Sequence, residues 1–228
     1  MDDGHVLVLS VALVCFAIVA LCAWYFSADQ RALRAMRAVP LRRIADVKGG
    51  EKVRIVGEVE APRTLRAPLS GRACAYWRVT VREQRGSGKS RRWVTIIDEQ
   101  EGVDFFLRDG KAKALIKTAH AQAVLDQDGR YVSGFMRDAP PELEVFLAQR
   151  GHSSKGWFFN KNMQYREGIV EPGETVAAVG VGRWERDPDE EPTAGGYRDV
   201  IQPRRLVLDR PEDGLLLISD RVEAVGTS

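Results

Sequence analysis

A run of apolar residues near the N-terminus places the strongest constraint on this chain. Residues 6–26 read VLVLSVALVCFAIVALCAWYF, and Ser10 is their only clearly polar member. A helix of this length spans about 30 Å, the thickness of the hydrocarbon core of a bilayer. A cleaved signal peptide would have a basic start and a shorter apolar core, whereas this chain starts with MDDGH. The sequence therefore predicts an N-terminal transmembrane helix at residues 6–26.

The charges on the two sides of this run predict its orientation. Two aspartates precede it, and a basic juxtamembrane segment, residues 27–47, follows it. Because positive residues favour the cytoplasmic side, we expect a single-pass protein of the cell (inner) membrane with its N-terminus outside and its main domain in the cytoplasm. The arginines of this segment either bind anionic lipid headgroups from a short amphipathic helix or only set the topology. They are Arg31, Arg34, Arg37, Arg42 and Arg43.

The composition excludes several classes of protein. The 228 residues include 34 Lys and Arg against 32 Asp and Glu, and basic and acidic residues are equal in number beyond residue 50. A neutral main domain lacks the positive surface that binds nucleic acid. Three Cys and three His are too few for a disulfide scaffold or for a cross-braced two-zinc module, which needs about eight ligands. We therefore expect no nucleic-acid partner, no metal and no cofactor.

From Lys52 onward, short β-rich runs alternate with turn signals. KVRIVGEVE alternates apolar and polar residues, and in CAYWRVTVRE the apolar Ala75, Trp77, Val79 and Val81 share one face. Similar runs are RRWVTIID, VDFFLRD, KALIK, AQAVLD, MQYREGIV, TVAAVGVGRW, residues 197–201 and GLLLIS. The pattern predicts a soluble region that is mostly β.

One segment between these runs is typical of a helix. Pro140-Pro141 opens ELEVFLAQR, in which Leu143, Phe146 and Leu147 fit one helical face, and Gly151 ends it. The dipeptides Asp109-Gly110 and Asp128-Gly129 instead predict tight turns between strands. We therefore expect an N-terminal transmembrane helix plus a mostly-β (α+β) domain with one short helix.

A weak internal repeat divides this domain. GGEKVRIVG, residues 49–57, and PGETVAAVG, residues 172–180, are identical at five of nine positions. The repeat predicts two related small β-units with the short helix between them, although Gly-Glu-x-Val is also a common way to begin a strand. The expected organisation is a tail at 1–5, the transmembrane helix at 6–26, the basic segment at 27–47, the β domain at 48–220 and a second tail at 221–228.

No motif in the chain indicates catalysis. Gly86-Ser87-Gly88-Lys89-Ser90 resembles a phosphate-binding loop, but Glu83 stands where the first glycine belongs and a strand follows. The basic residues around it predict a solvated hairpin tip; they are Arg82, Arg85, Lys89, Arg91 and Arg92. Cys74 heads a strand and is expected to be a small buried hydrophobic residue, because His120 and His152 form no recognisable arrangement with it. We predict no catalytic residue.

Several runs together resemble a known family. PLRRIADVKGGEKVRIVGEVEA, APLSGRACAYWRVTV, FFLRDGKAKALI and YREGIVEPGETVAAVG are similar to the GIDE domain, also called the "beside a membrane" (BAM) domain. This domain occurs in mitochondrial membrane-anchored ubiquitin ligases and in bacterial and archaeal membrane proteins. The resemblance implies structural roles for the matching positions, which are Pro68, Leu69, Cys74, Tyr76, Asp109, Glu167, Pro172 and Gly173.

The resemblance also bears on function. In the ligases, catalysis belongs to a separate zinc-binding RING domain, and this sequence has no such set of zinc ligands. We therefore expect a bacterial, membrane-anchored and non-catalytic binding or assembly module that recruits a protein, peptide or lipid ligand. Its expected partners are membrane lipid and another membrane or cytoplasmic protein. The alternatives are a ubiquitin-transferase-type protein, a structural subunit of a membrane complex, and a hydrolase built on Cys74 and His120.

Overall fold

The structure is a computed structural model. It describes residue 13 and residues 28–86, 90–126, 129–133, 141–153, 162–189, 193–195, 199–201 and 203–226. The helices in these ranges are short: α2 (Ala28–Arg37), α3 (Pro141–Ala148) and α4 (Val222–Val225). Two 3-10 turns, η1 (Ile44–Asp46) and η3 (Thr118–His120), accompany them, and the remaining regular structure is β.

The structure corrects the prediction of a transmembrane helix. Apart from Leu13, residues 6–26 lie outside the described part of the chain. No helix among the described residues is both long enough and apolar enough to cross a bilayer. The longest of them, α2, has 10 residues and is therefore only about 15 Å long. The described residues thus contradict the transmembrane part of the predicted fold class, and with it the single-pass topology and the inner-membrane localisation, whereas the predicted mostly-β character of the remaining chain agrees with the structure.

Five strands close into a barrel in place of the two predicted β-units. They are β1 (Lys52–Glu60), β6 (Phe105–Asp109), β7 (Ala112–Ile116), β14 (Arg204–Asp209) and β11 (Thr175–Arg186), which pairs back with β1. Only β7 and β14 run parallel within this ring. Numbered along the chain, the order is 1-2-3-5-4-1 with strands 3 and 5 parallel. This is the topology of the OB-fold, a five-stranded Greek-key barrel.

Burial in β6 follows the alternation of its sequence. In β6, Phe105 and Leu107 are fully buried, whereas Phe106 is half-buried and Arg108 is exposed. In β1, Val53 and Ile55 are likewise inaccessible to solvent. Period-two alternation therefore fills the barrel with branched and aromatic side chains, and their removal from water is the main stabilising term.

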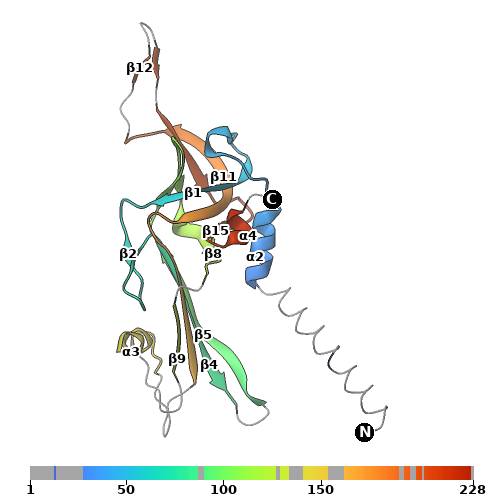
Figure 1. Cartoon of the computed structure of the whole chain (residues 1–228), viewed down its shortest axis with the longest axis vertical. Coiled ribbons are helices and arrows are strands. Elements are labelled where there is room, and N and C mark those ends of the chain that lie inside the picture. The colour runs from blue at the N-terminus through green and yellow to red at the C-terminus, as the bar shows by residue number, and fades with distance from the viewer. Residues whose placement is uncertain are drawn as a thin grey trace.

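Two long insertions into the barrel build a second sheet. Residues 61–104, between β1 and β6, contribute β4 (Tyr76–Arg85) and β5 (Arg92–Gly102). Residues 117–174, between β7 and β11, contribute β9 (Gly129–Ser133) and β10 (Met163–Val170). The strand order is β5-β4-β10-β9, and this sheet extends away from the barrel with α3 beside it (Figure 1).

The second sheet has one apolar face and one polar face. Trp77, Val79 and Val81 of β4 are buried against Leu143 and Leu147 of α3. The helix predicted near residues 142–150 is therefore confirmed, and Gly151 ends it with a φ of 72°. The residues between the apolar ones project from the opposite face, which α3 does not cover.

The helix α2 packs on the barrel side of the molecule. Its buried residues Ala32, Leu33 and Met36 contact Val179 of β11 and Ala224 of α4, and α2 and α4 lie side by side (Figure 1). Two short strands, β15 (Leu216–Ser219) and β8 (Ala121–Ala123), extend the barrel sheet at this point. The amphipathic helix considered for the basic segment exists, and its apolar face is used within the protein.

The two copies of the internal repeat form the beginnings of two strands of the same barrel. Its two copies, β1 and β11, pair with each other in antiparallel fashion. Each copy begins at a turn with a left-handed glycine, Gly50 with a φ of 81° and Gly173 with a φ of 90°. In both turns the glutamate that follows, Glu51 or Glu174, accepts a hydrogen bond from the backbone N–H three residues earlier. The repeated sequence therefore encodes a repeated turn.

The remaining elements are short. They are β2 (Leu65–Arg66), β3 (Ala73–Cys74), β12 (Thr193–Gly195) and β13 (Asp199–Ile201). The predicted turn at Asp109-Gly110 is confirmed, because it joins β6 to β7 with a φ of 62° at Gly110. Of the second predicted turn, Asp128 lies outside the described residues and Gly129 begins β9.

Candidate functional site

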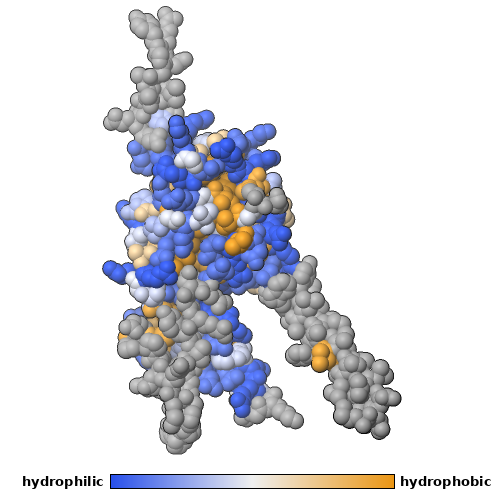
Figure 2. All heavy atoms as spheres, in the orientation of Figure 1, coloured by the Kyte–Doolittle hydropathy of each residue, from blue (hydrophilic) through white to orange (hydrophobic). Residues whose placement is uncertain are grey.

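The described residues on one face of the molecule are mainly hydrophilic (Figure 2). Figure 2 shows hydrophilic residues over most of one face, with hydrophobic ones gathered mainly over the barrel. The large apolar side chains that are exposed among the described residues stand on different elements; they are Leu13, Val145, Leu215 and Val222. Scattered exposed apolar residues of this kind are ordinary on folded proteins. The most distinctive surface feature is instead polar.

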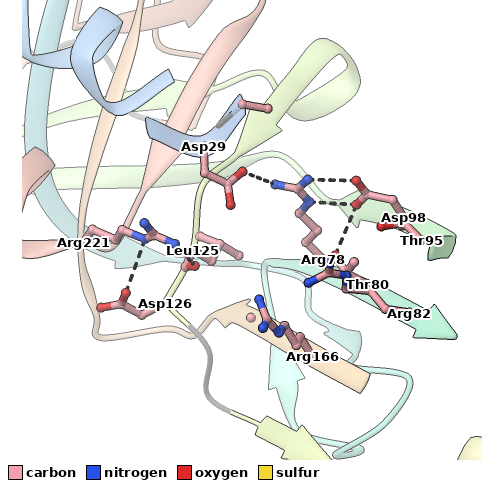
Figure 3. A pocket seen from close by; sticks show the side chains of 12 residues that line it. Asp29, Arg78, Thr80, Arg82, Thr95, Asp98, Leu125, Asp126, Arg166 and Arg221 are labelled. Carbon is pink, nitrogen blue, oxygen red and sulfur yellow. Dashed lines mark hydrogen bonds and ion pairs between the residues drawn. The ribbon is translucent and has the colours of Figure 1, made fainter. Parts of the chain in front are cut away.

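A pocket of about 370 Å³ lies where the polar face of the second sheet meets α2 and the start of α4 (Figure 3). We call it the arginine pocket. Its charged lining residues are Arg78, Arg82, Arg166 and Arg221 against Asp29, Asp98 and Asp126. Thr80, Thr95, Gly168, Leu125 and Ala28 complete the lining.

Strand alternation places three of these residues on one face of β4. Arg78, Thr80 and Arg82 are separated by the buried Val79 and Val81, so all three project away from the apolar core. In β10, Arg166 stands opposite Thr80 in the strand register. The polar face of the sheet is therefore a direct consequence of local sequence.

An irregularity in β5 adds a threonine to the pocket. The register between β4 and β5 shifts after Val81, which pairs with Ile97, so that Arg82 pairs with Thr95. In an uninterrupted ladder Arg82 would stand opposite Ile96. The shift leaves Ile96 packed against the apolar core and puts the Thr95 hydroxyl beside Arg82.

Arg78 is fixed by two carboxylates. Its guanidinium donates to both oxygens of Asp98 at 2.9 Å, to Asp29 at 3.2 Å and to the carbonyl oxygen of Ala123 at 3.0 Å. Hydrogen bonding to Asp98 raises the pKa of Arg78 above its ordinary value. Because Asp29 belongs to α2, this network also ties the helix to the second sheet (Figure 3).

Arg221 is held at the other end of the pocket. Its Nε lies 3.3 Å from Oδ1 of Asp126, and its Nη2 donates to the carbonyl oxygen of Leu125 at 3.3 Å. Gly168 allows this segment to lie close to β10, since an added Cβ would stand 2.6 Å from the carbonyl oxygen of Asp126. All three aspartates of the pocket are therefore engaged by Arg78 or Arg221.

The surroundings of Arg82 differ from those of Arg78 and Arg221. It is half-buried, its Nε is shielded from solvent, and it has no hydrogen-bond or ion-pair partner within the described ranges. Its side chain and that of Arg166 point into the space between Arg78 and Arg221 (Figure 3). With four arginines against three aspartates, the described lining of the arginine pocket carries an excess of one positive charge.

The five predicted membrane-proximal arginines lie elsewhere. Arg31 and Arg37 are exposed and Arg34 is half-buried on α2. Arg42 forms an ion pair with Glu51 at 3.4 Å, and Arg43 forms one with Asp109, itself a predicted motif position, at 3.6 Å. None of the five lines the arginine pocket.

Glu167 connects several of the predicted motif positions. Its carboxylate is 1% exposed and accepts hydrogen bonds from the backbone N–H groups of Leu69 at 2.8 Å and Ser70 at 3.0 Å. The half-buried Pro68 directly precedes these residues. Glu167 thus fastens the loop before β3 to one face of β10, while its neighbour Arg166 projects from the other face.

The other motif positions also make internal contacts. The Tyr76 hydroxyl donates to the carbonyl oxygen of Ala121 at 3.0 Å, and burial raises the pKa of Tyr76 to about 12. Pro172 and Gly173 are exposed in the turn before β11, where the N–H of Gly173 donates to the carbonyl oxygen of Val59 at 2.9 Å. The structure thus gives these positions roles in packing and turns.

The structure does not favour Cys74 as a nucleophile. The residue is fully buried, and its Sγ lies 3.9 Å from the carbonyl oxygen of Leu65. Burial, together with the charge of Glu167, raises the pKa of the Cys74 thiol to about 11, so it stays protonated near neutral pH. His120, the partner considered for it, is exposed in η3.

The sequence prediction missed the arginine pocket. Arg82 was assigned to a solvated hairpin tip, which suits the exposed Arg85, Arg91 and Arg92 but not the half-buried Arg82. The alternation of β4 already indicates a polar face, so that signal was present. Asp29 and Arg221 reach the pocket only through tertiary packing, and no local pattern could have found them.

A second charged cluster lies on the outside of the barrel. Asp187, 1% exposed, has its Oδ2 2.7 Å from Nζ of Lys113 and its Oδ1 3.9 Å from Nη1 of Arg205. Arg205 also pairs with Glu185 at 2.8 Å and Asp189 at 3.2 Å. OB-folds commonly bind oligonucleotides at the face of their second and third strands, which correspond here to β6 and β7. Lys113 lies on β7 and Arg205 on the neighbouring β14, and both are bound to carboxylates. We call this the barrel cluster.

Comparison with known proteins assigns neither a family nor a function to the chain. No model of a protein family, no curated protein and no solved structure matches the chain. The resemblance to the GIDE domain therefore stays a prediction, and the site must be interpreted from its own geometry.

Proposed function

We propose that this chain is a non-catalytic binding module that recognises an anionic group in the arginine pocket. The proposal keeps the expected recruiting role and bases it on a site distinct from the five arginines of the basic segment. The proposal rests mainly on the state of Arg82, which lines the pocket without a partner in the described part of the chain. The three aspartates of the lining cannot serve as its partner, because each already interacts with Arg78 or Arg221.

The physical argument concerns the cost of an unmatched guanidinium. A shielded donor without an acceptor destabilises a protein by about 1–3 kcal/mol, so such groups are uncommon, and a bound ion or ligand is one way to complete them. An anion in the pocket would accept from Arg82 and remove the excess positive charge. Charge-assisted hydrogen bonds from arginine to an oxyanion are among the strongest in proteins.

The neighbouring residues support a prepared site. Arg78 is held by Asp98 and Asp29, and Arg221 by Asp126, so both remain in place whether or not the pocket is filled. A ligand that binds there need order little more than the Arg82 side chain. Preorganisation of this kind lowers the entropic cost of binding.

The test is calorimetric titration of the protein with phosphate, sulfate and succinate at low ionic strength, where screening is weak. We expect one binding site, with affinity lowered at least tenfold by Arg82→Gln. The matched control is Arg92→Gln, which removes the same charge from an exposed position of β5 outside the pocket. Absence of binding by every anion, or equal binding by Arg82→Gln, would contradict the proposal.

A further inference from the structure

We infer that the anionic group is the phosphate of a small phosphorylated molecule, an inference that rests on the proposed function. The first reason is the arrangement of donors. A carboxylate has two oxygens in one plane, and one guanidinium fork satisfies both of them. The pocket offers further donors: Thr95 pairs with Arg82 in the β4–β5 register, and the Arg166 side chain points into the same space (Figure 3).

A phosphate group uses these additional donors. It has three terminal oxygens in a tetrahedral arrangement and a charge between −1 and −2 near neutral pH. Two oxygens match the fork of Arg82, and the third can accept a hydrogen bond from the hydroxyl of Thr95. The register shift in β5 is what puts a hydroxyl at this position, where an uninterrupted ladder would put Ile96.

The size and lining of the pocket indicate that the phosphate is attached to an organic group. At about 370 Å³, the pocket falls within the range of small-molecule sites. Leu125, which is 7% exposed, and Ala28 provide apolar surface next to the arginines. A phosphate ester with a compact organic part would fill both regions.

The affinities of three probes that share a phenyl ring separate the effect of the shape of the anionic group from the effect of its charge. Phenyl phosphate presents the proposed group, benzenesulfonate a tetrahedral group of charge −1, and benzoate a planar group of charge −1. We expect phenyl phosphate to bind best, at least tenfold more tightly than benzoate, with benzenesulfonate between them. Arg82→Gln should weaken phenyl phosphate at least tenfold, and Thr95→Val should weaken it about threefold.

The possible results distinguish the inferred phosphate ligand from the proposed anion binding on which it rests. Equal affinities for phenyl phosphate and benzoate would overturn the phosphate assignment and leave anion binding intact, whereas absence of binding by all three probes would overturn both. Thr95→Val is isosteric and lies at an exposed position, so it remains informative if Arg82→Gln fails to fold.

A parallel measurement separates two sources of the phosphate. Vesicles that contain phosphatidic acid carry the same group on a lipid. Binding of phenyl phosphate without retention on these vesicles assigns the site to a soluble ester. Retention that phenyl phosphate reverses and Arg82→Gln abolishes assigns the same phosphate chemistry to a lipid.

Discussion

The barrel cluster and the arginine pocket contain the same kinds of residue but match their charges differently. In the barrel cluster, Lys113 and Arg205 face three carboxylates, and both cations are paired. Their positive groups also lie 5.5 and 5.9 Å from the centre of the Phe106 ring. The arginine pocket has four cations for three carboxylates, and Arg82 has no partner within the described ranges.

This difference suggests a way to separate structural charges from functional ones. A cluster whose charges are all compensated contributes to stability and has little to offer a ligand. A cluster that leaves a shielded donor unmatched lowers stability, and a ligand is the natural source of the missing acceptor. Asp187→Asn and Arg82→Gln test whether the two clusters divide in this way, and Gly168→Ala tests the packing beside the arginine pocket.

The largest effect should come from Asp187→Asn in the barrel cluster. The substitution leaves Lys113 without the carboxylate at 2.7 Å and removes a charge that is 1% exposed. Since loss of one member of a buried ion pair is strongly destabilising, we expect the free energy of unfolding to fall by about 3 kcal/mol. Urea denaturation of both proteins measures the difference. Asp189→Asn is the control, because its side chain is largely exposed and an exposed pair contributes less than about 1 kcal/mol.

The difference in stability between wild type and Asp187→Asn should depend on pH, and the pKa of Asp187 gives the direction of the change. Burial alone would raise the pKa of Asp187, but hydrogen bonds from Lys113 and from the N–H of Asp189 hold it below the usual value. The ionised Asp187 therefore contributes fully to the free energy of unfolding at pH values well above about 3.9, the pKa of an aspartate in the unfolded chain. This contribution is lost as the pH falls through the lower pKa that Asp187 has in the folded protein. The stability gap between wild type and Asp187→Asn should narrow on acidification, and a gap that widens would contradict this assignment.

A smaller effect is expected from Gly168→Ala beside the arginine pocket. The new Cβ would stand 2.6 Å from the carbonyl oxygen of Asp126 and 2.7 Å from Cβ of Leu125, so the segment must move. We expect a loss of about 2 kcal/mol in thermal or urea unfolding. Gly49→Ala is the matched control, since an added Cβ meets no atom within 4 Å there. Equal stabilities for the two variants would mean that the close approach is not required.

The smallest effect should have the opposite sign. Arg82→Gln removes a shielded Nε that has no partner among the described residues, so we expect the free energy of unfolding to rise by about 1 kcal/mol. Arg92→Gln, on the same sheet but exposed, should change stability by less than about 0.5 kcal/mol. A loss of stability in Arg82→Gln would show that this arginine serves the fold, and the contrast between the two clusters would fail.

Much of the local structure could be predicted from the sequence. The strand at residues 52–60, the burial of Val79 and Val81, the helix with Leu143 and Leu147 inside, and the turn at Asp109-Gly110 all follow from short-range patterns. The transmembrane prediction failed, because no helix among the described residues has the length and apolar character that it requires. The following segment forms α2, whose apolar face packs on β11 and α4.

The assembly of these elements could not be predicted in the same way. The repeat suggested two β-units, but β1 and β11 pair with each other across more than one hundred residues of intervening chain to close one barrel. Strand pairing depends on backbone hydrogen bonds that any sequence of suitable pattern can make, so the pattern leaves the partner undetermined. The parallel pair of β7 and β14 gave no local signal either.

The sequence by itself determined which residues alternate, where the chain turns and which side of each strand is polar, because these properties depend on neighbours a few positions apart. Only the tertiary structure brought Asp29, Asp126 and Arg221 to the polar face of the second sheet. It thereby decided that Arg78 and Arg221 have carboxylate partners and that Arg82 has none in the part of the chain that the structure describes. Charge balance is a sum over all groups within a few ångströms, and that set exists only after the chain has folded.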